Sequence, residues 1–176
     1  MHNVMQFVVR IFNGIHILMV YLAKILLVAM TAIIAVHVFM RYVLRSGIHS
    51  SEELALLFAV WFIFIAMSIG VKQSLHISIN ILPANAHPKF NLVITKLRDL
   101  VVMWISVVMF YYGIILVQFT MRSIMPATRL PSGILYMVLP FAAVMMFYDS
   151  LMDLLGVDTR DAEIDARLGG GESFDD

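Results

Sequence analysis

Two adjacent glutamates, Glu52 and Glu53, stand at the start of an almost uninterrupted apolar stretch in HSSEELALLFAVWF. Paired carboxylates can act as a general acid and base, ligate a metal ion, or stabilise the start of a helix. Adjacent residues point about 100° apart on a helix, so these two carboxylates cannot converge on one substrate atom. Apart from His49, the pair has no histidine or aspartate nearby in the sequence that could complete a set of metal ligands. The sequence therefore favours a helix start over catalysis or metal binding.

The spacing of Ser50 and Glu53 is that of a capping box, S-x-x-E, in which each side chain binds the other residue's backbone N–H. Carboxylates in a first turn also interact favourably with the positive end of the helix dipole. We therefore predict that Glu53 acts through helix capping. Glu52 is free for an ion pair with an arginine of this chain or of a partner, and Arg41 and Arg45 are the nearest candidates in sequence.

Four other ionisable residues within the apolar stretches could also carry chemistry. Lys24 is interpreted as a side chain that reaches the membrane surface or pairs with another helix. His16 and His37 lie in the same apolar stretch and could suggest haem. Axial ligation of a b-type haem takes histidines from two helices, however, and the other three apolar stretches (54–71, 100–121 and 134–155) contain no histidine. Asp149 is expected near interfacial water. The sequence predicts no enzyme activity, no metal site and no cofactor.

Composition indicates the medium that surrounds these residues. The 176-residue chain is 61% hydrophobic and 14% charged, with a mean hydropathy of +0.91. Soluble domains have about 45–50% apolar and about 25% charged residues, so lipid is the expected solvent. The formal net charge of zero argues against a nucleic-acid-binding protein. The absence of cysteine excludes disulfides, thiol catalysis and thiolate metal sites.

Four segments have the length and apolarity of membrane spans, for which about 20 residues are needed. They predict an all-α integral membrane protein with spans at about 11–40, 54–71, 100–121 and 134–155. The first span exceeds the thickness of the hydrocarbon core, so it must tilt or begin at the membrane surface. It is also too long for a signal-peptide apolar region and is interpreted as a retained anchor.

The distribution of basic residues between the loops predicts orientation, because cytoplasmic loops carry an excess of lysine and arginine. With both termini in the cytoplasm, that side has seven basic residues: Arg10, Lys72, Lys89, Lys96, Arg98, Arg160 and Arg167. The opposite side then has four, which are Arg41, Arg45, Arg122 and Arg129. We predict that both termini are cytoplasmic.

Two further segments lie outside the predicted spans. HPKFNLVITKLRDL has apolar residues at helical spacing and predicts an amphipathic helix at the inner surface, which could equally be an extension of the third span. The glycine-containing acidic segment 156–176 is expected to be a disordered cytoplasmic tail, separate from the membrane domain formed by residues 1–155.

Several motifs, in order, resemble those of the DctQ family, the small membrane subunit of tripartite ATP-independent periplasmic (TRAP) transporters. They are RYVL at 41–44, SEELA at 51–55 with Trp61 following, HISINIL at 76–82 and TRLPSGILYMVLP at 128–140. The resemblance covers roughly residues 10–155. The chain departs from it at Asn80, where the family more often has an acid, and at Ala66, near a position that is often glycine.

The resemblance implies a non-catalytic small subunit in the bacterial inner membrane that braces a large sodium-coupled permease subunit. The complex would take up an organic acid, such as a dicarboxylate or sialic acid, delivered by a periplasmic binding protein. Helix-start and subunit contacts would involve Arg41, Ser50, Glu52, Glu53, Trp61 and His76, and contacts with the periplasmic partner would involve Arg45, Arg122 and Arg129.

Two other functional classes remain as alternatives. The chain could be the membrane anchor of a redox enzyme, which a Soret band of the purified protein would reveal. It could also be a small transporter acting alone, which uptake into liposomes containing only this chain would establish.

Overall fold

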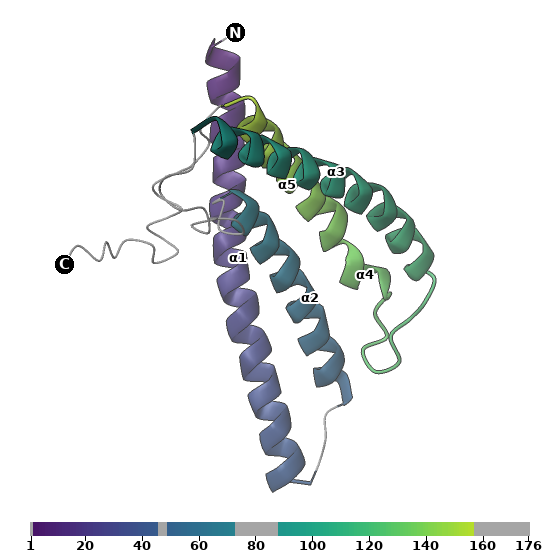
Figure 1. The fold of residues 1–176 in the computed structure, drawn as a ribbon. Helices are drawn as coiled ribbons and strands as arrows, with labels where there is room; N and C mark the ends of the chain where they lie inside the picture. The colour runs from purple at the N-terminus through teal and green to yellow at the C-terminus, as the bar shows by residue number, and fades with distance from the viewer. Residues whose placement is uncertain (1, 46–48, 73–87, 157–176) are drawn as a thin grey trace, which may run out of the picture.

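The fold is all-helical, as the sequence predicts. The computed structural model describes residues 2–45, 49–72 and 88–156. These residues form α1 (His2–Val43), α2 (His49–Lys72), α3 (Pro88–Thr120), α4 (Gly133–Tyr136) and α5 (Val138–Leu154), shown in Figure 1. The described part of the chain has no strand, and its one isolated antiparallel bridge joins Ile124 and Pro131.

Four helical segments are long and apolar enough to cross a membrane, which confirms the prediction of four spans. They are Val9–Val43, Ser50–Lys72, Val93–Thr120 and Gly133–Leu154. Helices suit this environment because they satisfy their backbone hydrogen bonds internally, where lipid offers no partners. At about 1.5 Å per residue, the 42 residues of α1 extend about 63 Å, roughly twice the thickness of a hydrocarbon core. The long first helix runs the length of the molecule (Figure 1).

Two elements differ from the simplest reading of the sequence. The amphipathic segment after Pro88 is continuous with the third span in α3, so it is an extension of that span. The fourth span is interrupted at Met137 between α4 and α5. Pro140 has no N–H to donate to the carbonyl of Tyr136, and it lies in the first turn of α5, where the missing donor costs little. The predicted disordered tail lies outside the described residues, apart from its first residue, Gly156.

The core lies where α1, α2 and α5 meet. α1 packs against α2, and α5 packs against both α2 and α3. The buried cluster consists of Met19, Val20, Ala23, Leu26, Ile65, Ile69, Val138 and Met145. Small residues bring α3 and α5 close together, since a Cβ at Gly113 would lie 3.3 Å from the Cβ of Leu139. Without a hydrophobic force between helices in lipid, such close packing is a principal source of association.

The up-and-down order of the helices gives the molecule two ends. The start of α1, the end of α2, the start of α3 and the end of α5 lie together, and we call this the terminal end (Figure 1). The opposite end, which we call the hairpin end, contains the end of α1, the start of α2 and the loop of residues 121–132 between α3 and α4. The ion pairs of the described residues lie toward these two ends.

Candidate functional site

Glu53 ties the start of α2 to the 121–132 loop at the hairpin end. Its Oε1 accepts a hydrogen bond from the N–H of Ala127 at 2.9 Å. Its Oε2 accepts bonds from the N–H and the hydroxyl of Thr128, each at 2.7 Å. Bonds to a charged acceptor are stronger than neutral ones. The capping-box prediction is therefore wrong: the carboxylate binds backbone N–H groups of a distant loop instead of the N–H of Ser50.

The 121–132 loop has enough internal structure to present fixed backbone donors to Glu53. The N–H of Ser132 donates to the carbonyl of Ser123 at 2.8 Å, and the N–H of Met125 donates to that of Leu130 at 2.9 Å. Trp61 of α2 adds a second tie, because its indole N–H donates to the carbonyl of Ile134 in α4 at 3.0 Å. α2 thus holds both the loop and the helix that follows it.

Ser51 and Glu52, the two residues before Glu53, contact α1. His37 Nδ1 is hydrogen-bonded to the hydroxyl of Ser51, and His37 Nε2 lies 3.3 Å from Oε1 of Glu52. The expected pairing of Glu52 with Arg41 or Arg45 is wrong, since its partner in the described chain is this histidine. The Glu52 side chain is 70% exposed, so the contact is a surface one. The hydroxyl of Ser50 points to the carbonyl of Ala127 at 3.5 Å, which is a long contact.

The four predicted arginines of this end are exposed. Arg41 and Arg45 lie at and just beyond the end of α1, whereas Arg122 and Arg129 lie on the 121–132 loop. Arg129 has a φ of 57°, so the loop turns sharply there. His76, the last of the predicted contact residues, lies outside the described residues. The structure therefore places Ser50, Glu52 and Glu53 at the start of α2, puts Trp61 in the middle of the same helix, and leaves the arginines on the surface.

A buried ionic cluster, which the sequence did not predict, joins three helices near the terminal end. The cluster contains His16 of α1, Lys72 of α2 and Asp149 of α5. These residues are 0%, 2% and 1% exposed, respectively. His16 Nε2 lies 2.8 Å from Oδ2 of Asp149. The Lys72 ammonium donates to the side-chain oxygen of Asn13 and lies 3.5 Å from Nδ1 of His16. We call Asn13, His16, Lys72 and Asp149 the junction cluster.

The junction cluster changes the expected roles of several residues. Asp149 is fully buried against His16, so the expectation that it reaches interfacial water is wrong. Lys24, the charged residue inside the first predicted span, is exposed, whereas Lys72 at the end of α2 is buried. The pattern did contain a signal: in an up-and-down bundle, residues near the start of α1 and the ends of α2 and α5 lie at similar depth. Sequence order therefore gives the depth of each residue in the bundle, but it does not show which helix faces pack against one another.

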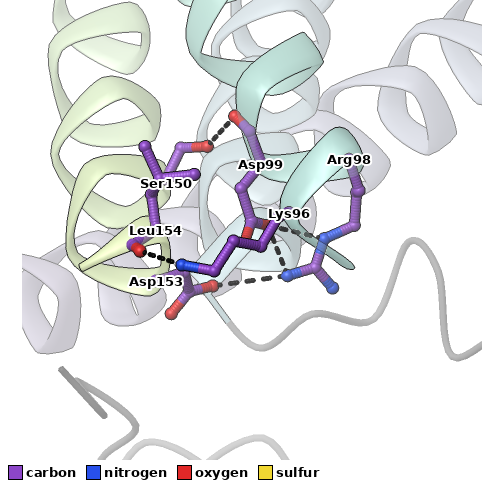
Figure 2. A network of polar contacts seen from close by, with 6 residues as sticks. All are labelled: Lys96, Arg98, Asp99, Ser150, Asp153 and Leu154. Atoms are coloured by element: carbon purple, nitrogen blue, oxygen red, sulfur yellow. Dashed lines mark hydrogen bonds and ion pairs between the residues drawn. The ribbon is translucent and has the colours of Figure 1, made fainter. Parts of the chain in front are cut away.

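A second polar network, shown in Figure 2, joins the start of α3 to the end of α5. Arg98 donates to Oδ1 of Asp99 at 2.6 and 2.8 Å, and it lies 3.6 Å from Oδ2 of Asp153. Ser150 donates to the carbonyl of Asp99 at 2.6 Å. Lys96 donates to the carbonyl of Leu154 at 2.7 Å, which satisfies an acceptor left free in the last turn of α5.

Apolar side chains cover the outer faces of the bundle. The most apolar stretch of α3 has only 11% of its residues buried, compared with 50% for the segment formed by α4 and α5. Its exposed aromatic residues are Trp104, Phe110, Tyr111, Tyr112 and Phe119. A shallow apolar groove, lined by seven residues of α3 and by Leu139 of α5, includes Trp104 and Tyr112. This face is built for contact with lipid or with another membrane protein.

The polar residues of the described chain are thus engaged mainly in holding helices and a loop together. Across residues 2–45, 49–72 and 88–156, no group of three or more His, Cys, Asp or Glu residues is placed to hold a metal ion. The two ends differ in character: at the hairpin end a carboxylate fixes a loop, and near the terminal end buried polar side chains join α1, α2 and α5.

Comparison with known proteins adds a family assignment. Residues 30–160 match the family described as tripartite ATP-independent periplasmic transporters, DctQ component. Two proteins of Haemophilus influenzae, both provisionally named TRAP transporter small permease proteins, are similar to the chain. One is 24% identical over 77% of this chain and 82% of its own length, and the other is 27% identical over 69% and 75%.

Proposed function

The chain belongs to the DctQ family of TRAP transporter small permease subunits, and on that premise we propose that it acts as a scaffold for a large permease subunit. Four apolar helices and this family membership make it a multi-pass membrane protein. The large subunit carries the sodium-coupled movement of an organic acid, such as a dicarboxylate or sialic acid. The small subunit fixes its partner in the bacterial inner membrane.

The exposed aromatic face of α3 is the observation that best supports bracing. Aromatic side chains supply large contact areas with little loss of rotamer freedom, and they are enriched at protein interfaces. In lipid, association depends on close packing of side chains rather than on hydrophobicity alone. The face of α3 combines the protruding side chains of Trp104, Tyr111 and Tyr112 with an apolar groove, and a partner helix can pack its side chains into that groove.

The use of polar groups in the spans also supports a non-catalytic role. Glu53 is committed to the 121–132 loop, and Asp149 is paired with His16. These carboxylates stabilise this chain's own architecture, so transport chemistry falls to the large subunit. The exposed Arg122 and Arg129 on a fixed loop would suit contact with acidic residues of a periplasmic binding protein, because charge complementarity speeds encounter.

Assembly with the large subunit provides the first test. Co-expression and purification in mild detergent should give a stable complex, and Trp104→Ala with Tyr112→Ala should lower the amount of large subunit recovered with this chain. Truncation creates a packing defect at a protein interface, whereas lipid chains fill the space at a lipid-facing site. The matched control is Leu18→Ala with Ile25→Ala, exposed residues of α1. Equal recovery with both pairs would contradict docking through α3, and a monomer despite co-expression would contradict the scaffold role.

We further propose that the terminal end faces the cytoplasm and the hairpin end faces the periplasm, as the balance of basic residues predicts. The chain has no cysteine, so introduced cysteines are clean probes. Ser123→Cys at the hairpin end should react with a membrane-impermeant thiol reagent in intact cells. Leu155→Cys at the terminal end should react only after the membrane is opened. Both positions are exposed, so a reversed pattern would overturn the orientation.

A further inference from the structure

An apolar groove opens between α1 and α2 toward the hairpin end, and we call it the α1–α2 groove. Its volume is about 370 Å³, and its apolar lining residues are Met30, Ile34, Ala55, Leu56 and Ala59. Ile34 and Leu56 are exposed, whereas Ala55 is buried. Two large residues therefore form the walls of the groove, and small residues form its floor.

The α1–α2 groove extends along both helices from the end of the spans toward their middle. On α2 its lining runs from Glu52 to Ala59, which is about 10 Å along the helix axis. Glu52 lies near the start of a span that begins at Ser50, and Tyr42, near the end of α1, is 78% exposed. An amphipathic aromatic ring at the end of a span is typical of the headgroup level of a bilayer. The mouth of the groove therefore lies among lipid headgroups, and its apolar part lies among acyl chains.

Two hydrogen-bond acceptors meet at the mouth of the groove, which is lined by His37, Ser51 and Glu52. The buried Nε2 of His37 makes no hydrogen bond with any described residue, although Oε1 of Glu52 lies 3.3 Å away. A ring that donates from Nδ1 to the hydroxyl of Ser51 keeps a lone pair on Nε2. That lone pair and the Glu52 carboxylate repel each other unless a donor binds both of them. The mouth therefore suits a ligand group that donates and is positively charged.

An exposed arginine adds the opposite charge at the same end of the groove. Arg41 follows His37 by four residues on α1, so it lies on the same side of that helix, one turn further out. Side chains lean toward the N-terminus of their helix. Arg41 therefore leans back toward the groove, whereas Glu52, on the antiparallel α2, leans outward. An anionic group beside Arg41 would lie deeper in the membrane than a cationic group beside Glu52.

We propose that the α1–α2 groove binds one molecule of an ethanolamine phospholipid. The ammonium group, which has three donors and no acceptor, donates to Glu52 and to Nε2 of His37. The phosphate binds Arg41, and one acyl chain lies in the groove. A helix with its side chains is about 10–12 Å across, so a partner helix would rest on the two walls, whereas a single acyl chain can reach the alanines between them. The bound lipid would join the end of α1 to the start of α2.

Headgroup selectivity provides the first test, and it needs only this chain, so it is independent of the scaffold role. The purified full-length chain in detergent is titrated with phosphatidylethanolamine or with phosphatidylcholine of the same acyl chains, and bound lipid is counted by native mass spectrometry. The two lipids have the same phosphate and the same charge, but phosphatidylcholine has methyl groups in place of the N–H donors. Phosphatidylethanolamine should bind about three- to tenfold more tightly, the effect of one charge-assisted hydrogen bond at a partly exposed site.

Substitutions at the mouth and on the floor locate the lipid. Glu52→Gln should abolish the preference for phosphatidylethanolamine, whereas Arg41→Gln should weaken the binding of both lipids equally. Arg122→Gln, an exposed arginine of the 121–132 loop, is the charge control. A phosphatidylethanolamine with a photoreactive acyl chain, incorporated in nanodiscs, should cross-link to residues 30–37 and 51–59. Ala59→Leu fills the floor and should suppress these cross-links, whereas Ala32→Leu, at an exposed position on the opposite side of α1, should not.

Three results would overturn the proposal. They are equal binding of the two lipids by the wild-type chain, a preference that survives Glu52→Gln, and cross-links that map away from the groove. The cross-linking is repeated on the complex with the large subunit, where loss of the groove cross-links would show that a protein fills the groove instead of a lipid. The wild-type comparison of the two lipids needs no substitution, so it decides the question even where a variant fails to fold.

Discussion

Asp149→Ala is expected to destabilise the protein by roughly 3–5 kcal/mol, the usual cost of leaving a buried charge without its partner. The substitution removes the carboxylate from a site in which His16 and Lys72 are almost completely buried. The junction cluster would then keep the Lys72 ammonium but lose its carboxylate. Denaturant unfolding of the purified full-length chain in detergent, followed by circular dichroism, measures the free energy of unfolding.

Asp153→Ala is the matched control for this prediction. Asp153 lies one turn further along α5, pairs with Arg98 at 3.6 Å, and has a side chain that is 22% exposed. Exposed and partly exposed ion pairs contribute about 0–1 kcal/mol, so we expect a small effect. Similar losses in the two variants would show that burial of the charge is not what makes Asp149 important.

A compensating substitution separates charge from packing. In the double variant Asp149→Leu with Lys72→Met, both buried charges are replaced by apolar groups of comparable size. Such replacements are often neutral or stabilising, so most of the lost stability should return. If the double variant is as unstable as Asp149→Ala, the junction cluster is held by hydrogen-bond geometry rather than by charge balance.

The second large effect is expected for Glu53→Gln, which should release the 121–132 loop. Both carboxylate oxygens accept backbone N–H groups in the wild-type protein, from Ala127 and Thr128. A glutamine presents an NH₂ group in place of one oxygen and so sets a donor against a donor. Hydrogen exchange at the amides of Ala127 and Thr128 should become faster, and the thermal stability and the yield of assembled complex should fall.

Glu52→Gln provides the control, because Glu52 is an exposed neighbour whose contact is with His37. We expect it to leave exchange in the loop unchanged. In either variant, sodium-driven uptake in liposomes, normalised to intact complex, should remain substantial, since the carboxylates are structural. Unchanged exchange in Glu53→Gln would refute the loop tie. Normal assembly with no uptake would instead assign the glutamate a direct part in transport.

The sequence by itself determined the class, the number of spans and the family. An apolar excess of this size requires lipid, and a helix in lipid must satisfy its own backbone, so length and hydropathy are enough to locate spans. The ordered motifs from Arg41 to Pro140 were enough to indicate the DctQ family, which the family match confirms. These properties are local along the chain, and each can be read from one segment at a time.

Tertiary structure alone decided which polar residues meet. Glu53 and Thr128 are 75 positions apart, and His16 and Asp149 are 133 apart. Local spacing predicted a capping box and an arginine partner for Glu52, because Ser50 and Arg45 are the near neighbours in sequence. The rotation of each helix and the angles at which the helices cross instead place Glu53 against a loop and Glu52 beside His37. They also place Lys72 beside His16. Depth in the membrane follows from sequence order, whereas the facing direction of each side chain depends on how the helices pack.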